Sequence, residues 1–318
     1  MLYHQQETLV AADGHDIHAQ LWVPEGQPSC VIQILHGLGE HSDRYGRFAA
    51  KAVERRFAVC VHDHRGHGKH ADDLGHFAGA SGWLQLVSDS ETVNDYVRER
   101  FAGIPVVLLG HSMGSYVAQT FAMQCGSRLS GLILSASTWP SRLQLAPARL
   151  LARIEALRLG TCGKSGLLDK LGFGNFNRPF EPARTELDWL SRDEVEVDRY
   201  VSDPLCGGPY SCGLWLGLLS GLFGVASDMA ISQVPSDLPV LISGGESDPV
   251  GGDSGMTRLA MHYAQTSHQR IKVKIYAEGR HEMLNETNRD EVTADWLDWV
   301  SVATRRRRSD RNLQRDQQ

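Results

Sequence analysis

The sequence predicts an α/β fold in which a mostly parallel central sheet is flanked by helices and carries a helical cap insertion. The first observation is that short apolar segments, rich in Val, Ile and Leu, alternate with longer segments whose apolar residues recur every three or four positions. This alternation is typical of buried parallel strands connected by helices. The second observation is that residues 138–235 break the alternation, which resumes after them.

The order of the expected elements follows from the same patterns. Two segments of alternating polarity, QETLVAADG and HDIHAQLWVP, open the chain, and the Asp13-Gly14 pair between them predicts an antiparallel hairpin. The later strands are expected at residues 30–37, 57–63, 105–110, 130–137, 238–245 and 270–279. The helices of the core are expected at residues 44–56, 83–101, 114–126, 255–266 and 289–304.

These boundaries give a core formed by residues 1–137 and 236–303 and a cap, or lid, formed by residues 138–235. The cap contains CGLWLGLLSGLFGVAS (212–227), an almost wholly apolar segment that is too short to span a bilayer. Its glycines recur every four residues and would form one stripe on a helix: Gly213, Gly217 and Gly221. Two interpretations remain open, a buried cap helix and a lid or acyl-tunnel wall that touches a membrane.

The charge distribution bears on the partners of the protein. The 318 residues carry a net charge of −6, which gives no electrostatic reason to expect a nucleic-acid partner. Residues 304–318 hold six Arg and two Asp, so this segment has a net charge of +4 and the remainder −10. We expect this basic tail to be disordered; the alternative is that it docks on an anionic membrane surface.

The cysteines and the N-terminal segment indicate the compartment. Six cysteines are scattered without a CxxC pair, which is typical of thiols in a reducing environment. The opening residues, MLYHQQETLVAADGHD, lack a basic region followed by an apolar stretch, so we expect no signal peptide. These features predict a cytoplasmic protein, with peripheral membrane contact through the cap or the tail as an open alternative.

A G-x-S-x-G pentapeptide at Gly110, Ser112 and Gly114 lies directly between a predicted strand and a predicted helix. The two glycines permit a sharp turn that would hold the serine in a strained conformation above the sheet. The N-terminus of the following helix also favours developing negative charge. In this context the motif predicts that Ser112 is a nucleophile.

A serine hydroxyl needs a histidine base and an acid that orients the base. In this architecture the acid and then the histidine follow the serine along the chain. Asp248 lies in the loop after the strand that follows the insertion, and His281 follows the last strand. Glu246 and Asp253 are neighbouring alternatives to Asp248, and spacing does not exclude Glu246. His268 precedes the final strand and so lies at its wrong end.

Acyl transfer also needs backbone N–H donors for the oxyanion of the tetrahedral intermediate. One expected donor is the amide of Met113, the residue after the nucleophile. The other is the amide of Leu38, which lies between Gly37 and Gly39 in the loop after an earlier strand. The glycines let this backbone approach a substrate closely.

Three motifs resemble those of a known family: HGxGEHSxRY at residues 36–45, DHxGHG at 63–68 and GHSMG at 110–114. With the late Asp and His they are similar to the monoglyceride lipase and lysophospholipase branch (serine aminopeptidase S33 type) of the α/β-hydrolase superfamily. The HGxGEH and GHSMG pair is specific to this branch, whereas GxSxG alone would indicate only the superfamily. The resemblance covers roughly residues 8–137 and 236–303.

The resemblance implies an α/β-hydrolase fold and a set of site residues. The family's catalytic triad falls on Ser112, Asp248 and His281, and its oxyanion amides fall on Leu38 and Met113.

In related lipases the Glu and Arg of the first motif help to form the polar pocket for the glycerol head. This implies substrate contacts for Glu40 and Arg44, and we assign His36 of the same motif to this pocket with them. An ion pair between Glu40 and Arg44 that only braces the loop is an equally open interpretation.

The leading function is therefore that of a serine carboxylester hydrolase that cleaves lipid-like monoesters, such as monoacylglycerols or lysophospholipids, without a metal or organic cofactor. The runner-up is an aminopeptidase of the proline-iminopeptidase type, which needs a cap carboxylate to hold the substrate amine; Glu181, Glu186 and Asp188 are available. A non-catalytic binding protein on the same fold is a third hypothesis.

One further motif invites a different interpretation. The segment VHDHRGHGKH, residues 61–70, holds four histidines in nine positions: His62, His64, His67 and His70. Their order differs from the H-x-H-x-D-H pattern of a metal-binding loop. We interpret the segment as scaffolding beside the oxyanion loop, with Asp63 and Arg65 holding it by hydrogen bonds.

Overall fold

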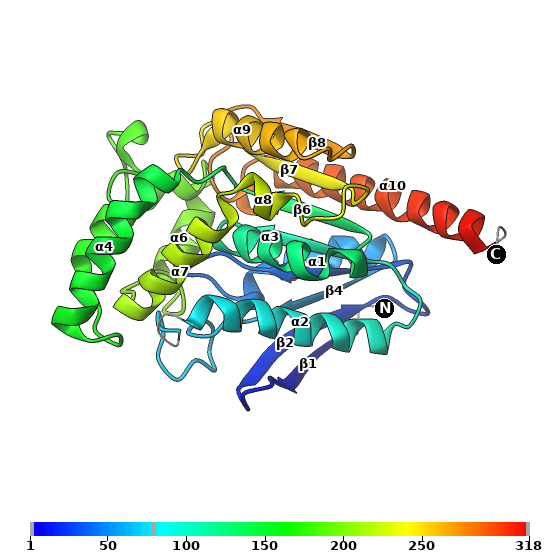
Figure 1. Ribbon diagram of the computed structural model, residues 1–318, viewed down its shortest axis with the longest axis horizontal. Coiled ribbons are helices and arrows are strands. Elements are labelled where there is room, and N and C mark those ends of the chain that lie inside the picture. The colour runs from blue at the N-terminus through cyan, green and yellow to red at the C-terminus, as the bar shows by residue number, and fades with distance from the viewer. Residues whose placement is uncertain (1–2, 78–80, 316–318) are drawn as a thin grey trace.

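The computed structural model describes residues 3–77 and 81–315, and within these ranges it has an eight-stranded central sheet (Figure 1). The strands are β1 (Tyr3–Val10), β2 (Asp16–Val23), β3 (Cys30–Leu35), β4 (Phe57–His62), β5 (Val106–His111), β6 (Gly131–Ser135), β7 (Val240–Gly245) and β8 (Ile271–Tyr276). Every strand begins and ends within a few residues of its predicted bounds.

The sheet has the strand order β1-β2-β4-β3-β5-β6-β7-β8. Strands β1 and β2 form the predicted antiparallel hairpin, which joins β4 in an antiparallel pair, and all the other pairs are parallel. Strands β3 to β7 are buried along their whole length, as expected for parallel strands covered on both faces. The predicted α/β fold class is confirmed.

Two layers of helices cover the sheet. One face is covered by α1 (Gly46–Glu54) and α10 (Arg289–Arg315), whose apolar side chains share one core with the sheet. The other face is covered by α2 (Gly82–Arg100), α3 (Met113–Cys125) and α9 (Gly252–Gln265), which share a second core. Short 3-10 segments, η1 (Ser42–Tyr45), η3 (Gly126–Arg128) and η6 (Met283–Asn285), complete the core.

The insertion between β6 and β7 is helical, as predicted, and lies at one end of the sheet (Figure 1). Its helices are α4 (Arg142–Leu159), α5 (Gly166–Phe173), α6 (Glu194–Ser202), α7 (Cys212–Val225) and α8 (Asp228–Ile231), with short 3-10 turns at η4 (Arg178–Phe180) and η5 (Asp188–Leu190). We call this insertion the cap.

Two interpretations of the apolar segment were open, and the structure favours the first: helix α7 is a buried cap helix. A Cβ atom added to Gly217 would lie 2.6 Å from the Phe77 ring, and one added to Gly221 would overlap the Trp83 ring. Part of the predicted stripe of small residues therefore packs closely against two aromatic side chains of the core.

The C-terminal segment differs from its prediction. We expected disorder from Thr304, whereas α10 continues to Arg315. No Gly or Pro occurs in this helix, and arginine is a good helix former, so the chain has no local reason to stop at the apolar boundary. Residues 316–318 of the predicted tail lie outside the described residues. In the part of the chain that the structure describes, no helix combines the length and the apolar character that a membrane span requires.

Candidate active site

Ser112 lies on a tight turn between β5 and α3, at the centre of the sheet. Its backbone has φ 49° and ψ −118°, a strained conformation for a residue with a side chain. A Cβ atom on Gly114 would overlap the carbonyl oxygen of Leu35, and one on Gly110 would overlap that of Gly114. Gly114 is thus needed because the turn packs directly against the end of β3, and Gly110 is needed because the turn folds back closely on itself.

His281 joins this serine to Asp248. The Nε2 atom of His281 is 2.9 Å from Ser112 Oγ, and its Nδ1 atom is 2.9 Å from Asp248 Oδ1. The His281 and Asp248 side chains are both buried. The loop after β7 holds Asp248 in place, since the amide of Val250 donates to the same carboxylate oxygen. The three residues predicted from chain order therefore form one continuous hydrogen-bonded chain.

The rival residues lie elsewhere. Glu246 is exposed, and its carboxylate accepts a hydrogen bond from the amide of Glu278. Asp253 is exposed in the first turn of α9. His268 is buried, and its Nε2 is 2.7 Å from the carbonyl oxygen of Leu238. None of these three is hydrogen-bonded to Ser112 or His281 in the described part of the chain.

The environment tunes the basicity of His281. Burial alone would lower the pKa of the imidazole, but the adjacent Asp248 carboxylate outweighs this effect and raises the pKa above its usual value of 6.5. Glu282 and Glu40 act in the same direction. The imidazole is therefore a stronger base than an isolated histidine.

The backbone around Ser112 offers hydrogen-bond donors. Among the described residues, neither the Leu38 nor the Met113 amide N–H has a protein acceptor. A Cβ atom on Gly37 would lie 3.3 Å from Ser112 Cβ, so the loop that carries Leu38 passes directly beside the serine. The arrangement leaves two amides near Ser112 available for an oxyanion.

Glu40 and Arg44 belong to one buried network. Arg44 makes a two-pronged ion pair with Glu282, with distances of 2.6 and 2.7 Å, and contacts Glu40 at 3.1 Å. Glu40 also accepts hydrogen bonds from the Gly37 amide (2.5 Å) and the Tyr45 hydroxyl (3.0 Å). These contacts include the ion pair of the loop-bracing interpretation, and Glu40 also lines the cavity described below.

Glu282 is a residue that sequence reasoning missed. Burial alone would raise the pKa of its carboxyl group, but the Arg44 guanidinium holds that pKa well below its usual value. The pair joins the loop that carries Leu38 to the loop that carries His281. Its sequence signal was a carboxylate directly after the predicted base.

His36 is placed differently from the other residues of its motif. It is fully buried and does not line the cavity. Its Nδ1 is 2.8 Å from the Gly37 carbonyl oxygen, and its Nε2 accepts a hydrogen bond from the His64 amide. Burial lowers the pKa of this imidazole to about 3, so the ring is a neutral brace within the loop.

A cavity of about 500 Å³ opens above Ser112 and His281. Its walls are mainly aromatic and apolar side chains of the cap: Phe173, Phe176, Leu187, Trp189, Leu190, Tyr200 and Tyr210. Trp189 lies against His281, with ring centroids 4.9 Å apart. No residue of α7 lines the cavity. Sequence reasoning predicted the cap but none of these wall residues, because they carry no local motif.

The four histidines of residues 61–70 form part of the scaffold. His64 and His67 pack around His36, with ring centroids 4.3 and 5.2 Å from it, and burial lowers the pKa of all three imidazoles. His70 stacks on His18 of β2, with ring centroids 3.9 Å apart.

The predicted loop contacts are confirmed. Asp63 accepts a hydrogen bond from the Ser42 amide, and Arg65 pairs with Asp13 and Asp89. Of the side chains that the structure describes, a different group brings metal-ligating atoms together: His41, Asp203 and Cys206.

A family model, several proteins and several solved structures are similar to this chain. The family model described as "Serine aminopeptidase, S33" matches residues 26–288. Human monoglyceride lipase is 29% identical over 276 residues, which cover 85% of this chain and 82% of that protein. The monoacylglycerol lipase of Mycolicibacterium smegmatis is 24% identical, over 93% of this chain and 96% of the relative. A thermostable carboxyl esterase from Bacillus coagulans, solved in complex with glycerol, has a TM-score of 0.85 at 27% identity and covers 95% of this chain and 99% of its own.

Proposed function

The chain belongs to the serine aminopeptidase S33 family of α/β-hydrolases and is an esterase or lipase of its monoglyceride lipase branch, and on that premise we propose that it hydrolyses lipid monoesters through Ser112, His281 and Asp248. One observation carries the proposal. The serine on the strained turn, the imidazole and the carboxylate are linked by two hydrogen bonds of 2.9 Å at the floor of an apolar cavity.

The chemistry follows from this geometry. His281 takes the proton of Ser112 as the serine oxygen attacks the acyl carbonyl, and Asp248 stabilises the imidazolium that forms. The amides of Leu38 and Met113 donate to the oxyanion of the tetrahedral intermediate. His281 then gives the proton to the departing alcohol, which leaves an acyl group on Ser112. A water molecule, deprotonated by His281, releases the carboxylic acid by the same steps in reverse order.

The cavity supports a substrate with an apolar tail and a small polar head. We assign residues 138–235 as the cap that accepts the acyl chain, since Phe173, Phe176 and Trp189 form an apolar wall. Polar groups gather near the serine, where Glu40 and Glu282 line the same cavity. A glycerol-like alcohol could donate its hydroxyl groups to these carboxylates. The human and mycobacterial relatives are named for monoacylglycerols, which have an apolar tail and a small polar head.

One observation favours the aminopeptidase alternative. Of the three cap carboxylates named for it, Glu186 lines the cavity, where it could hold a substrate amine. The side chain is exposed, however, so an ion pair there would be solvated and weak. Asp188 is instead engaged by the amides of Arg184 and Thr185. The apolar walls therefore favour the lipid ester.

We also propose that the enzyme works in peripheral contact with a membrane in the cytoplasm. The outer helix of the cap, α4, exposes five large apolar side chains, of which Leu143 (86% exposed) and Leu157 (89%) are nearly free of protein contacts; the other three are Leu150, Ile154 and Leu159. An exposed apolar helix face of this kind fits the boundary of a lipid bilayer. The six free cysteines fit a reducing compartment.

A substrate panel tests the proposed specificity. Values of kcat/KM would be compared for monoacylglycerols, lysophospholipids, short-chain esters and prolyl amides of matched solubility. We expect monoacylglycerols of medium or long chain to be the best substrates. A preference for prolyl amides that is lost in Glu186→Gln would replace the lipase proposal by the aminopeptidase alternative.

A further inference from the structure

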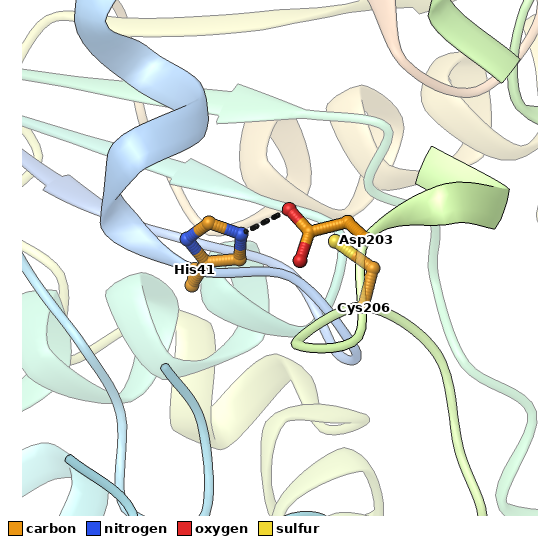
Figure 2. Close-up of side chains that lie close together, drawn as sticks. All are labelled: His41, Asp203 and Cys206. Atoms are coloured by element: carbon orange, nitrogen blue, oxygen red, sulfur yellow. Dashed lines mark hydrogen bonds and ion pairs between the residues drawn. The ribbon is translucent and has the colours of Figure 1, made fainter. Parts of the chain in front are cut away.

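A cluster of three metal-ligating side chains lies outside the catalytic residues, at the contact between the core and the cap. His41 directly precedes η1, Asp203 follows the last residue of α6, and Cys206 lies three residues further along the cap. One potential ligand atom of each residue lies within 4.8 Å of the other two. Figure 2 shows the three side chains converging, with His41 Nε2 at 2.9 Å from Asp203 Oδ2.

The donor set is one that zinc prefers. An imidazole nitrogen, a carboxylate oxygen and a thiolate sulfur bind Zn²⁺ at about 2.0–2.3 Å in tetrahedral geometry, so the ligand atoms of such a site are roughly 3.3–3.6 Å apart. The spacing of the cluster already approaches this arrangement, since its ligand atoms lie within 4.8 Å of one another.

The surroundings of the cluster fit an ion. His41 is buried, and Asp203 and Cys206 are half-buried, which distinguishes them from an exposed acidic patch. His41 and Asp203 also line an open surface depression of about 700 Å³, through which an ion and a water ligand can reach them. On the far side of the ring, Asp43 Oδ2 lies 3.8 Å from His41 Nδ1, near the position that a carboxylate takes when it orients a zinc-bound histidine.

We propose that His41, Asp203 and Cys206 bind one Zn²⁺ ion, with water as the fourth ligand, and that the bound ion fastens the cap to the oxyanion loop. His41 coordinates through Nε2 and keeps its ring proton on Nδ1, facing Asp43. The thiol of Cys206 releases its proton to solvent as the zinc–sulfur bond forms. No oxidation or reduction takes place.

Hydrogen bonds already join the cap to the loop that carries Leu38. The carbonyl oxygen of Gly39, next to Leu38, accepts hydrogen bonds from the Tyr200 hydroxyl (2.7 Å) and the Gly207 amide (2.8 Å). Tyr200 and Gly207 flank Asp203 and Cys206 in the cap. A metal ion would therefore add coordinate bonds across the contact that positions one of the two oxyanion amides.

Cobalt titration of the full chain tests the site directly, because Co²⁺ substitutes for zinc and is coloured. We expect one equivalent to produce the visible bands of tetrahedral Co²⁺ and a thiolate-to-cobalt charge-transfer band. The charge-transfer band should vanish in Cys206→Ser. Since even changes outside the ligand shell cost roughly 10–100-fold in affinity, Asp203→Asn should weaken binding at least about tenfold. Zn²⁺ should displace the cobalt and raise the Tm of the wild type.

Two variants serve as matched controls. Cys162→Ser removes an exposed thiol whose Sγ lies 3.9 Å from His76, and it should leave the bands unchanged. Ser112→Ala should bind the metal as the wild type does. The proposal is overturned if no charge-transfer band forms, if the band survives in Cys206→Ser, or if it is lost in either control. Because absorption and Tm report binding without turnover, the outcome is independent of the proposed esterase activity.

Discussion

At the scale of single residues, the strain at Ser112 and the burial of His281 explain why each of these residues needs a specific neighbour. The serine keeps φ at 49° because Gly114 lets the turn pack against Leu35 and Gly110 lets the turn close on itself. The imidazole keeps a raised pKa although it is buried, because Asp248 supplies a compensating charge. Removing one of these neighbours should therefore change the conformation of Ser112 or the pKa of His281 in a predictable direction.

Asp248→Asn tests the electrostatic part of this account. The reaction needs neutral His281, so wild-type kcat/KM should fall as the pH drops through a pKa above 6.5. Without the carboxylate, burial dominates, the pKa of His281 falls, and the acid limb of the pH profile should move to lower pH. The value of kcat should also drop by about 10⁴-fold. A pH profile with a p-nitrophenyl ester measures both effects, and an unmoved acid limb would refute the assigned role of Asp248.

Glu282→Gln tests the buried pair with Arg44. Loss of one partner from a buried ion pair costs about 3–5 kcal/mol. We expect the free energy of unfolding to fall by about 3 kcal/mol, the low end of this range, because Glu40 still contacts Arg44. Urea denaturation measures the change. The matched control is Asp198→Asn, which breaks an exposed pair with Arg184 and should cost less than about 1 kcal/mol. Equal losses in the two variants would contradict the account.

At the scale of helices and strands, local patterns predicted the core well. The strands β3 to β7 and the core helices α1, α2 and α3 were predicted within a few residues, because continuous apolar runs and a period of 3.6 residues are local properties of the chain. Helix α10 was predicted too short at its C-terminus, because the periodic apolar residues end near Ala303 while the backbone continues as a helix.

The cap helix α7 offers a test of packing at this scale. Gly221→Ala places a methyl group in the Trp83 ring and should destabilise the protein by about 1–3 kcal/mol. In Gly224→Ala, three residues further along the same helix, the new methyl group meets nothing within 4 Å, so stability should stay unchanged or rise slightly. Thermal or urea unfolding distinguishes the two. A Gly221→Ala variant as stable as Gly224→Ala would contradict the close packing of α7.

At the scale of the whole molecule, the site combines segments from both ends of the core with the cap. The hydrogen-bonded set of Ser112, His281 and Asp248 could be predicted because each member follows a recognisable strand in a fixed order. The cavity walls could not, since Trp189, Tyr200 and Tyr210 reach the site through the tertiary fold of the cap. The same holds for the pairing of Arg44 with Glu282, which are 238 positions apart in the chain.

The outer face of the cap predicts membrane binding. A double variant, Leu143→Asp with Leu157→Asp, should lower binding to anionic phospholipid vesicles at least about a hundredfold, because each buried leucine contributes about 1.5 kcal/mol or more. Vesicle sedimentation measures this, and Met229→Asp, at an exposed methionine of α8, is the control. If binding is instead abolished by added salt and unaffected by the leucine changes, the Arg-rich tail and not the cap makes the contact.

The central claim is that Ser112 forms the acyl-enzyme, and a fluorophosphonate probe tests it most directly. The probe reacts covalently with an activated serine, and peptide mass spectrometry locates the labelled residue. We predict that labelling of the wild type abolishes ester turnover and maps to Ser112 alone, and that Ser112→Ala is neither labelled nor active on p-nitrophenyl esters. Active wild-type protein that resists the probe, or a Ser112→Ala variant that retains turnover, would contradict the account.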